Sequence, residues 1–98
     1  MDDYELMECI EEGLSIFGQS VCHTVYWRLA YLNNLPYDGI LVNPEAFVEG
    51  LQSIFGSGAR QIEGVIIGKI RERFGLIELQ SDSLSYVIRY IRRQIIYV

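Results

Sequence analysis

The stretch NPEAFVEGLQSIFG, residues 43–56, contains a complete helix signal and decides the fold class. Asn43 is a residue type favoured at helix N-caps, and Pro44 follows it at the first helical position, where the missing N–H carries no cost. Apolar residues then recur at intervals of three and four, which places them on one face of a helix. Gly56 ends the pattern, because glycine readily adopts the left-handed conformation that follows many helices. The stretch therefore predicts an amphipathic helix over residues 44–55.

The same apolar periodicity recurs on both sides of this stretch and predicts four more helices. They span residues 2–17, 20–33, 57–74, and 81 or 82 to the C-terminus. The last segment also contains residue types that suit a strand, but Val87 and Ile88 break strand alternation, so we expect a helix. Residues 35–42 are expected to form a loop, with a very short extended piece at residues 40–42. The 98 residues are therefore predicted to form a single all-α domain, a compact bundle of about five helices.

Small residues are expected to set the helix ends. Ser20 is the predicted N-cap of the second helix. Three helices are predicted to stop at a glycine with positive φ after phenylalanine: Gly18, Gly56 and Gly75.

Gly64 and Gly68 instead lie inside a predicted helix, where each costs about 1 kcal/mol relative to alanine. Either they are merely tolerated, or a neighbouring helix approaches closely and compensates for them.

Charge is distributed unevenly along the chain. The formal net charge is −5, which argues against a nucleic-acid binder that works by bulk charge. Residues 1–12 carry six acids and no base, whereas residues 60–98 carry seven bases and four acids. We expect the acidic first helix to be able to dock on the basic last helix, within one chain or across a dimer. Half of the residues are hydrophobic, which excludes intrinsic disorder.

The sequence contains no motif for catalysis, a cofactor or a metal. Cys22 and His23 are adjacent, but neighbouring residues on a helix point about 100° apart and do not meet. Cys9 and Cys22 with a single histidine match no zinc pattern, and their predicted separation favours buried free thiols over a disulfide. The segment from Gly56 to Arg60 leads into a helix and is an alternative anion site, although it lacks the lysine of a phosphate-binding loop. We expect a protein that is not an enzyme.

The last helix carries the candidate interaction surface. Tyrosines and arginines recur there at helical spacing: Tyr86, Arg89, Tyr90, Arg93 and Tyr97. These residue types are enriched at interface hot spots, and they also contact nucleic acids. A polar face softened by tyrosine is the simpler explanation. Because Ile96 and Val98 add apolar area away from the main stripe, we expect a protein partner, most simply a second copy in a homodimer.

Part of the chain resembles a known family. The resemblance rests on four runs: Leu14–Val21, Val25–Leu29, Asn43–Leu51 and Ile54–Glu63. Over about residues 12–75 the chain is similar to a small archaeal family, named as an output domain of Nitrosopumilus-type signalling proteins. The resemblance implies an all-helical domain with a role in signalling or regulation, and with a signalling protein as a further partner. It supplies no catalytic residue.

These observations favour a non-enzymatic interaction or regulatory module. The first alternative is a nucleic-acid-associated regulator, in which the helices before and after residues 55–57 form a helix-turn-helix-like pair. The second is a small ligand-binding protein or enzyme with a buried pocket. The N-terminus lacks the basic start of a signal peptide, and no apolar run approaches the roughly 20 residues of a membrane span. We therefore expect a cytoplasmic protein.

Overall fold

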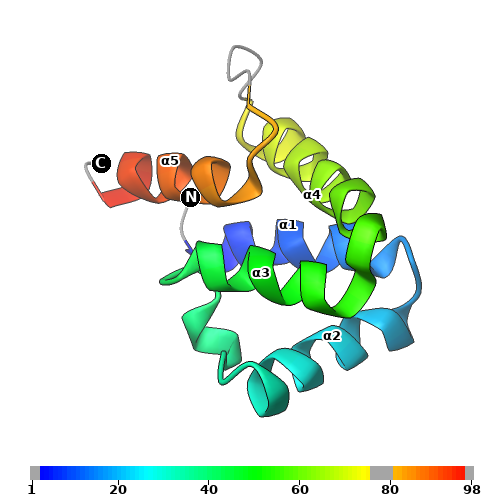
Figure 1. The fold of residues 1–98 in the computed structure, drawn as a ribbon. Coiled ribbons are helices and arrows are strands. Elements are labelled where there is room, and N and C mark those ends of the chain that lie inside the picture. Colours follow the sequence, from blue (N-terminus) through cyan, green and yellow to red (C-terminus); the bar gives the residue numbers. More distant parts are fainter. Residues whose placement is uncertain (1–2, 76–80, 97–98) are drawn as a thin grey trace.

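The computed structural model describes residues 3–75 and 81–96, and these residues form helices connected by short turns (Figure 1). The elements in chain order are α1 (Asp3–Ser15), α2 (Gln19–Leu32), the 3-10 helix η1 (Tyr37–Gly39), α3 (Pro44–Phe55), the 3-10 helix η2 (Gly56–Gly58), α4 (Ala59–Phe74) and α5 (Leu84–Ile96). No strand occurs among the described residues. The predicted all-α fold of about five helices is confirmed, and the last segment is helical as expected.

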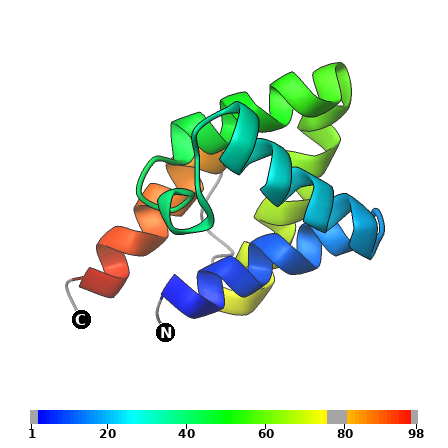
Figure 2. The ribbon, with the colours of Figure 1, turned by 90° about the horizontal axis from the view of Figure 1, so that it is seen from below.

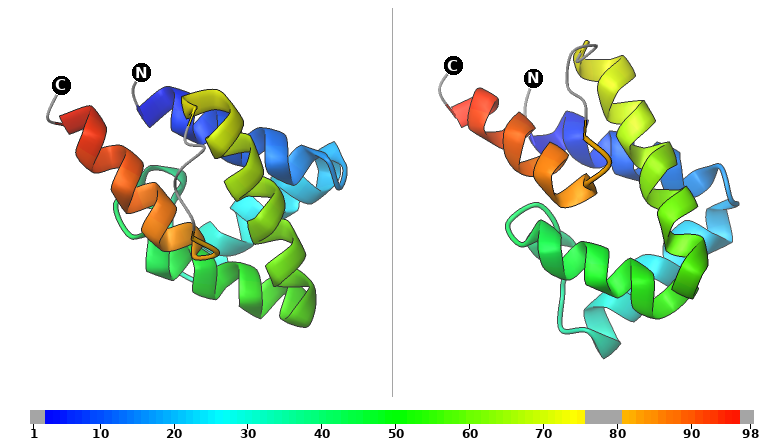
Figure 3. Two further views of the ribbon diagram at one scale, coloured as in Figure 1. Left: turned by 90° about the horizontal axis from the view of Figure 1, so that it is seen from above. Right: turned by 45° about the horizontal axis from the view of Figure 1, so that its top comes forward.

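The helices pack around one core. α1 lies against α4 and α2, while α3 contacts α2, α4 and α5 (Figure 2). The first turn of α1 and the last turn of α5 lie side by side, although they come from opposite ends of the chain (Figure 3). The radius of gyration is 12.6 Å, close to the value of about 13 Å for a compact domain of this length. The helices therefore form a single domain.

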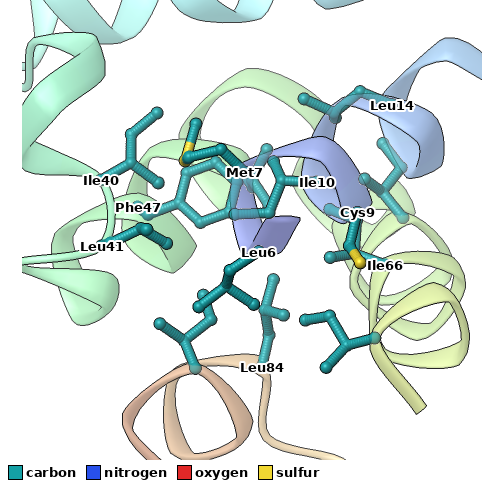
Figure 4. Packing of buried hydrophobic residues seen from close by; sticks show 14 of the residues in the cluster. Leu6, Met7, Cys9, Ile10, Leu14, Ile40, Leu41, Phe47, Ile66 and Leu84 are labelled. Carbon is teal, nitrogen blue, oxygen red and sulfur yellow. The ribbon is translucent and has the colours of Figure 1, made fainter. Parts of the chain in front are cut away.

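Phe47 of α3 lies near the centre of the core. Its side chain is completely buried, and Met7, Ile10, Ile40 and Leu41 surround it in the close view (Figure 4). Burial of a side chain of this size stabilises the fold by about 1.5–3 kcal/mol. The apolar face predicted for residues 44–55 thus brings α3 onto α1 and onto the loop before α3.

Polar side chains and glycines define the helix ends, partly as predicted. The Asn43 side-chain oxygen accepts a hydrogen bond from the Ala46 N–H at 3.3 Å, so asparagine caps α3 as expected. Gly75 follows α4 in the left-handed conformation, with φ 69°. The prediction for Ser20 is wrong, because Gly18 occupies the N-cap of α2 with φ 116° and no side chain caps this helix. Gly18 therefore starts α2 and does not stop α1, which already ends at Ser15.

Two helix starts lie later than expected. The helix predicted from residue 57 begins at Ala59, because residues 56–58 form η2. The helix predicted from residue 81 or 82 begins at Leu84, where the Ser83 hydroxyl accepts a hydrogen bond from the Tyr86 N–H at 3.3 Å. Serine is thus the side-chain cap of α5, a role that it does not have in α2.

The loop before α3 also differs from the prediction. Residues 40–42 form a hydrogen-bonded turn and not a short extended piece. Ile40 has helical backbone angles, and the Asn43 N–H donates to the Gly39 carbonyl at 2.9 Å. Ile40 and Leu41 are nevertheless buried, so the expectation that this loop is anchored to the core is correct. The compact turn satisfies backbone groups that an isolated extended piece would leave without partners.

Close helix packing occurs at glycines other than those predicted. A Cβ atom added to Gly64 or Gly68 would meet nothing within 4 Å, so no helix among residues 3–75 and 81–96 compensates for them. A Cβ added to Gly13 would lie 2.7 Å from Ile66 Cγ1 and 3.1 Å from Ile66 Cα. A Cβ added to Gly50 would lie 2.2 Å from Leu29 Cδ2. Gly13 and Gly50 are therefore the positions where absence of a side chain permits helix contact.

Alanine substitution should separate these two kinds of glycine. Gly13→Ala is expected to lower the free energy of unfolding by about 1–3 kcal/mol, because the new methyl group would overlap Ile66 and its backbone. Gly68→Ala should raise it by up to about 1 kcal/mol, because alanine favours the helix and the added group meets open space. Urea denaturation of both variants measures the difference. A stable Gly13→Ala protein would contradict the tight contact between α1 and α4.

Candidate functional site

The predicted interaction surface on α5 is partly exposed. Tyr86 has 47% of its surface exposed, and its ring stacks on that of Tyr90 with centroids 6.4 Å apart. Tyr90 is half-buried and packs against the core. Arg93 is exposed and has no hydrogen-bond or ion-pair partner among residues 3–75 and 81–96. Tyr97, the fifth predicted residue, lies outside the described residues.

Two arginines of α5 are bound within the chain. Arg89 forms an ion pair with Glu45 of α3, and its Nε lies 2.6 Å from Glu45 Oε2. This hydrogen bond lowers the pKa of Glu45. Arg92 donates to both carboxylate oxygens of Asp3 at 3.2 Å and to the Leu41 carbonyl at 3.0 Å. Arg89, a predicted interface residue, is thus occupied by a contact within the domain.

The basic half of the chain meets the acidic half within one molecule. Arg73 of α4 donates to Glu8 at 3.3 Å and to Glu12 at 3.0 Å, and these contacts hold α4 on α1. The Asp3–Arg92 pair joins α1 to α5 in the same way. Each pair is partly exposed, so screening by solvent keeps its contribution to stability small. Docking of the acidic helix on basic helices therefore occurs within the chain, on α4 as well as α5.

A hollow of about 250 Å³ lies where α1, the η1 region and α5 meet. Its lining comprises Asp3, Tyr4, Met7, Tyr37, Asp38, Leu41, Val42 and Arg92. The hydroxyl of Tyr37 donates a hydrogen bond to Glu11 at 3.0 Å, and its ring meets that of Tyr26 edge-on at 5.2 Å. Burial and the contact with Glu11 raise the pKa of Tyr37 to about 12. Two acids, Asp3 and Asp38, and one base, Arg92, line the hollow, and Arg92 is already bound to Asp3.

The outer face of α2 exposes the largest aromatic pair. Trp27 is 57% exposed and Tyr31 is 71% exposed, and their ring centroids lie 5.2 Å apart. Leu32, the last residue of α2, is also 62% exposed. We call Trp27, Tyr31 and Leu32 the α2 patch. These two aromatic residues were not identified as a surface from the sequence.

The reason for this omission lies in how α2 packs. Only three of its residues are buried, Cys22, Val25 and Leu29, so the helix contributes a narrow face to the core. Apolar periodicity alone cannot distinguish a wide buried stripe from a narrow stripe beside an exposed aromatic pair. The aromatic pair at an interval of four residues, on a helix without any acidic residue, was the available signal.

Chemistry by thiols or a metal finds little support in this geometry. Cys9 and Cys22 are both buried free cysteines, as expected. Burial raises the pKa of both thiols, which favours the less reactive protonated form. Within the part of the chain that the structure describes, no group of three or more histidine, cysteine or acidic residues could hold a metal ion. No helix there is both long and apolar enough to cross a membrane.

The helix-turn-helix-like alternative depends on the basic residues of α4. α3 and α4 are joined by η2, which gives the tight connection that this alternative requires. However, Arg71 donates to the Ser81 carbonyl at 3.1 Å and Arg73 binds two acids of α1. Only Arg60 and Lys69 remain on α4 without a hydrogen bond from their charged groups to a described residue. Two such bases provide little charge for binding to phosphates.

Comparisons with protein-family models, curated proteins and solved structures find no match to this chain.

The contact of Tyr37 with Glu11 should make stability depend on pH at alkaline values. Tyrosine ionises near pH 10 in an unfolded chain, whereas the pKa of Tyr37 in the fold is about 12. Because this pKa is raised, the contribution of Tyr37 to stability is full below pH 10 and is lost as the pH rises toward 12. Tyr37→Phe should therefore lose less stability than the wild type over this interval, as measured by urea denaturation.

Tyr86 provides the matched control, because its exposed fraction of 47% is close to the 46% of Tyr37. Tyr86→Phe also removes one hydroxyl, but from a residue outside the contact with Glu11, so its stability should follow the wild type across the same pH interval. Parallel curves for Tyr37→Phe and wild type would contradict the assigned role of Tyr37.

Proposed function

We propose that the protein is a non-enzymatic interaction module that self-associates as a homodimer through the α2 patch. The observation that supports this proposal most directly is the exposed and mutually packed pair Trp27–Tyr31, together with the exposed Leu32. Tryptophan and tyrosine carry much of the binding energy at protein interfaces. When a partner covers a large aromatic pair that was exposed to water, the free energy falls, and this favours association.

The charge of α2 favours a second copy as the partner. Residues 19–32 contain no acidic residue, and Arg28 is their only base apart from His23. In a two-fold symmetric dimer the same patch is present on both sides of the interface. Two copies of α2 therefore meet with little charge repulsion, whereas two copies of the acidic face of α1 would repel each other. The low charge and the aromatic pair thus favour the same face.

A regulatory role for this module is consistent with the remaining surfaces. The resemblance to a family of signalling output domains favours transmission of a signal through protein contacts, with a signalling protein as a second partner. Tyr86, Tyr90 and Arg93 of α5 form the second candidate contact surface in this proposal. They lie on a different helix from the α2 patch, so a dimer has this surface available for a further protein.

Trp27 provides a direct test because it is the only tryptophan of the chain. The wild type is expected to have the mass of a dimer at tens of micromolar in light scattering. Its fluorescence emission should shift to longer wavelength on dilution, as Trp27 becomes exposed to water. Tyr31→Ala should weaken the dimer about tenfold or more, the usual loss at an interface hot spot.

Variants on α5 serve as the control for this experiment. Tyr86→Ala removes an exposed aromatic side chain that lies outside the α2 patch, and should leave the dimer unchanged. The double variant Tyr90→Ala and Arg93→Glu tests the interface predicted on α5. Loss of the dimer in the α5 variants but not in Tyr31→Ala would move the interface to α5. A monomeric wild type would contradict self-association itself.

A further inference from the structure

A polar hollow of about 220 Å³ lies between α4 and the segment that leads into α5. Its lining comprises Arg60, Glu63, Gly64, Ile67, Arg71, Ser81 and Asp82. Gly64 leaves this space open, because a Cβ atom added there would meet nothing within 4 Å. Glycine in the middle of a soluble helix is unfavourable. The presence of Gly64 at this position, beside an open hollow, therefore needs a physical explanation.

Glu63 is a buried carboxylate that faces this hollow. Only 9% of the residue is exposed, and it is the one buried charged residue among residues 3–75 and 81–94. Its Oε2 atom has no hydrogen-bond partner among the described residues. Burial raises the pKa of Glu63, and the nearby charge of Arg60 offsets this effect in part. A buried carboxylate without a partner is costly, so a cationic group that reaches it would be stabilised.

The guanidinium group of Arg71 also has unused hydrogen-bonding capacity. One of its terminal nitrogens, Nη2, donates to the Ser81 carbonyl at 3.1 Å, which fixes the side chain beside the hollow. Its Nε atom is buried and has no partner among the residues that the structure describes. Arg60 provides a second positive charge at the same hollow. Two arginines in this position favour a carboxylate group.

The combination of charges indicates the class of ligand. The lining contains two bases, Arg60 and Arg71, and two acids, Glu63 and Asp82. The arginines would repel a bare metal cation, and the acids would repel a phosphate. We propose that this hollow binds a small zwitterion, a free α-amino acid, with its ammonium group toward Glu63 and its carboxylate toward Arg60 and Arg71. The volume favours a small side chain such as that of glycine, alanine or serine.

This site is independent of the proposed dimer, because α4 provides most of its lining and the α2 patch provides none. Glu63 belongs to the lining, so an ammonium group in the hollow lies beside its side chain without a change in the backbone. Ile67 provides apolar contact beside the charged groups.

Two glycine variants test the proposal, since both are expected to fold at least as well as the wild type. Gly64→Ala places a methyl group in the hollow and should weaken binding of glycine, alanine or serine about tenfold or more. Gly68→Ala makes the same change one turn further along α4, outside the lining, and should leave binding unchanged. Titration calorimetry on the full chain measures each amino acid separately.

Charge variants and simpler probes complete the experiment. Glu63→Gln should weaken binding of the amino acid about tenfold or more, because it removes the charge that faces the ammonium group. Acetate and methylammonium each carry only one of the two charges and should bind much more weakly than the amino acid. The temperature of unfolding of each variant shows that it is folded.

Three results would overturn the proposal. The first is absence of binding for all three amino acids to the wild type at millimolar concentration. The second is binding of acetate that equals binding of the amino acid, which would define a simple anion site. The third is an equal loss in Gly64→Ala and Gly68→Ala together with a smaller mass in light scattering. That result would show that the glycines serve a helix contact with a second copy.

Discussion

The contact between Gly13 and Ile66 is the constraint on which the arrangement of this domain depends. Because Gly13 has no side chain, α1 comes close enough to α4 for a Cβ at this position to lie 3.1 Å from the Ile66 Cα. The same approach places the Cys9 thiol 3.8 Å from the Lys69 carbonyl. It also brings Arg73 to the acids of α1. A close-packed interior resists even one additional methyl group, so this contact determines where both helices lie.

The surface ion pairs follow from this packing. They neutralise charges that the sequence alone would assign to separate acidic and basic surfaces. The acidic start of the chain lies beside the basic helices, so Arg73 and Arg92 are bound to carboxylates of the same molecule. The uneven charge along the sequence is thereby balanced inside one domain. The outer face of α2 carries few charges and exposes Trp27 and Tyr31. The charge pattern along a sequence therefore identifies a partner only after contacts within the chain are known.

Predictions succeeded where one local signal was decisive, and several failed where a neighbouring residue or a distant contact took precedence. Asn43 and Pro44 determine the start of α3 through the backbone beside them, so the sequence is sufficient there. Ser20 has the residue type of a cap, but Gly18 makes the sharp entry into α2 and takes this position. The surface residues of α5 were placed on the correct helix, yet Arg89 is bound to Glu45 of α3, which lies 44 residues away. Spacing within one helix contains no information about that contact.

The sequence by itself determined which segments form helices, because this depends on propensity, caps and the helical repeat over a few residues. Only the tertiary structure decided which glycines permit helix contact and which lie open. Gly13 and Gly64 are the same residue type within helices, but one meets Ile66 and the other borders a polar hollow. The physical reason is that atoms from distant parts of the chain fill the space beside one glycine and leave the space beside the other open. That arrangement is decided when the helices pack.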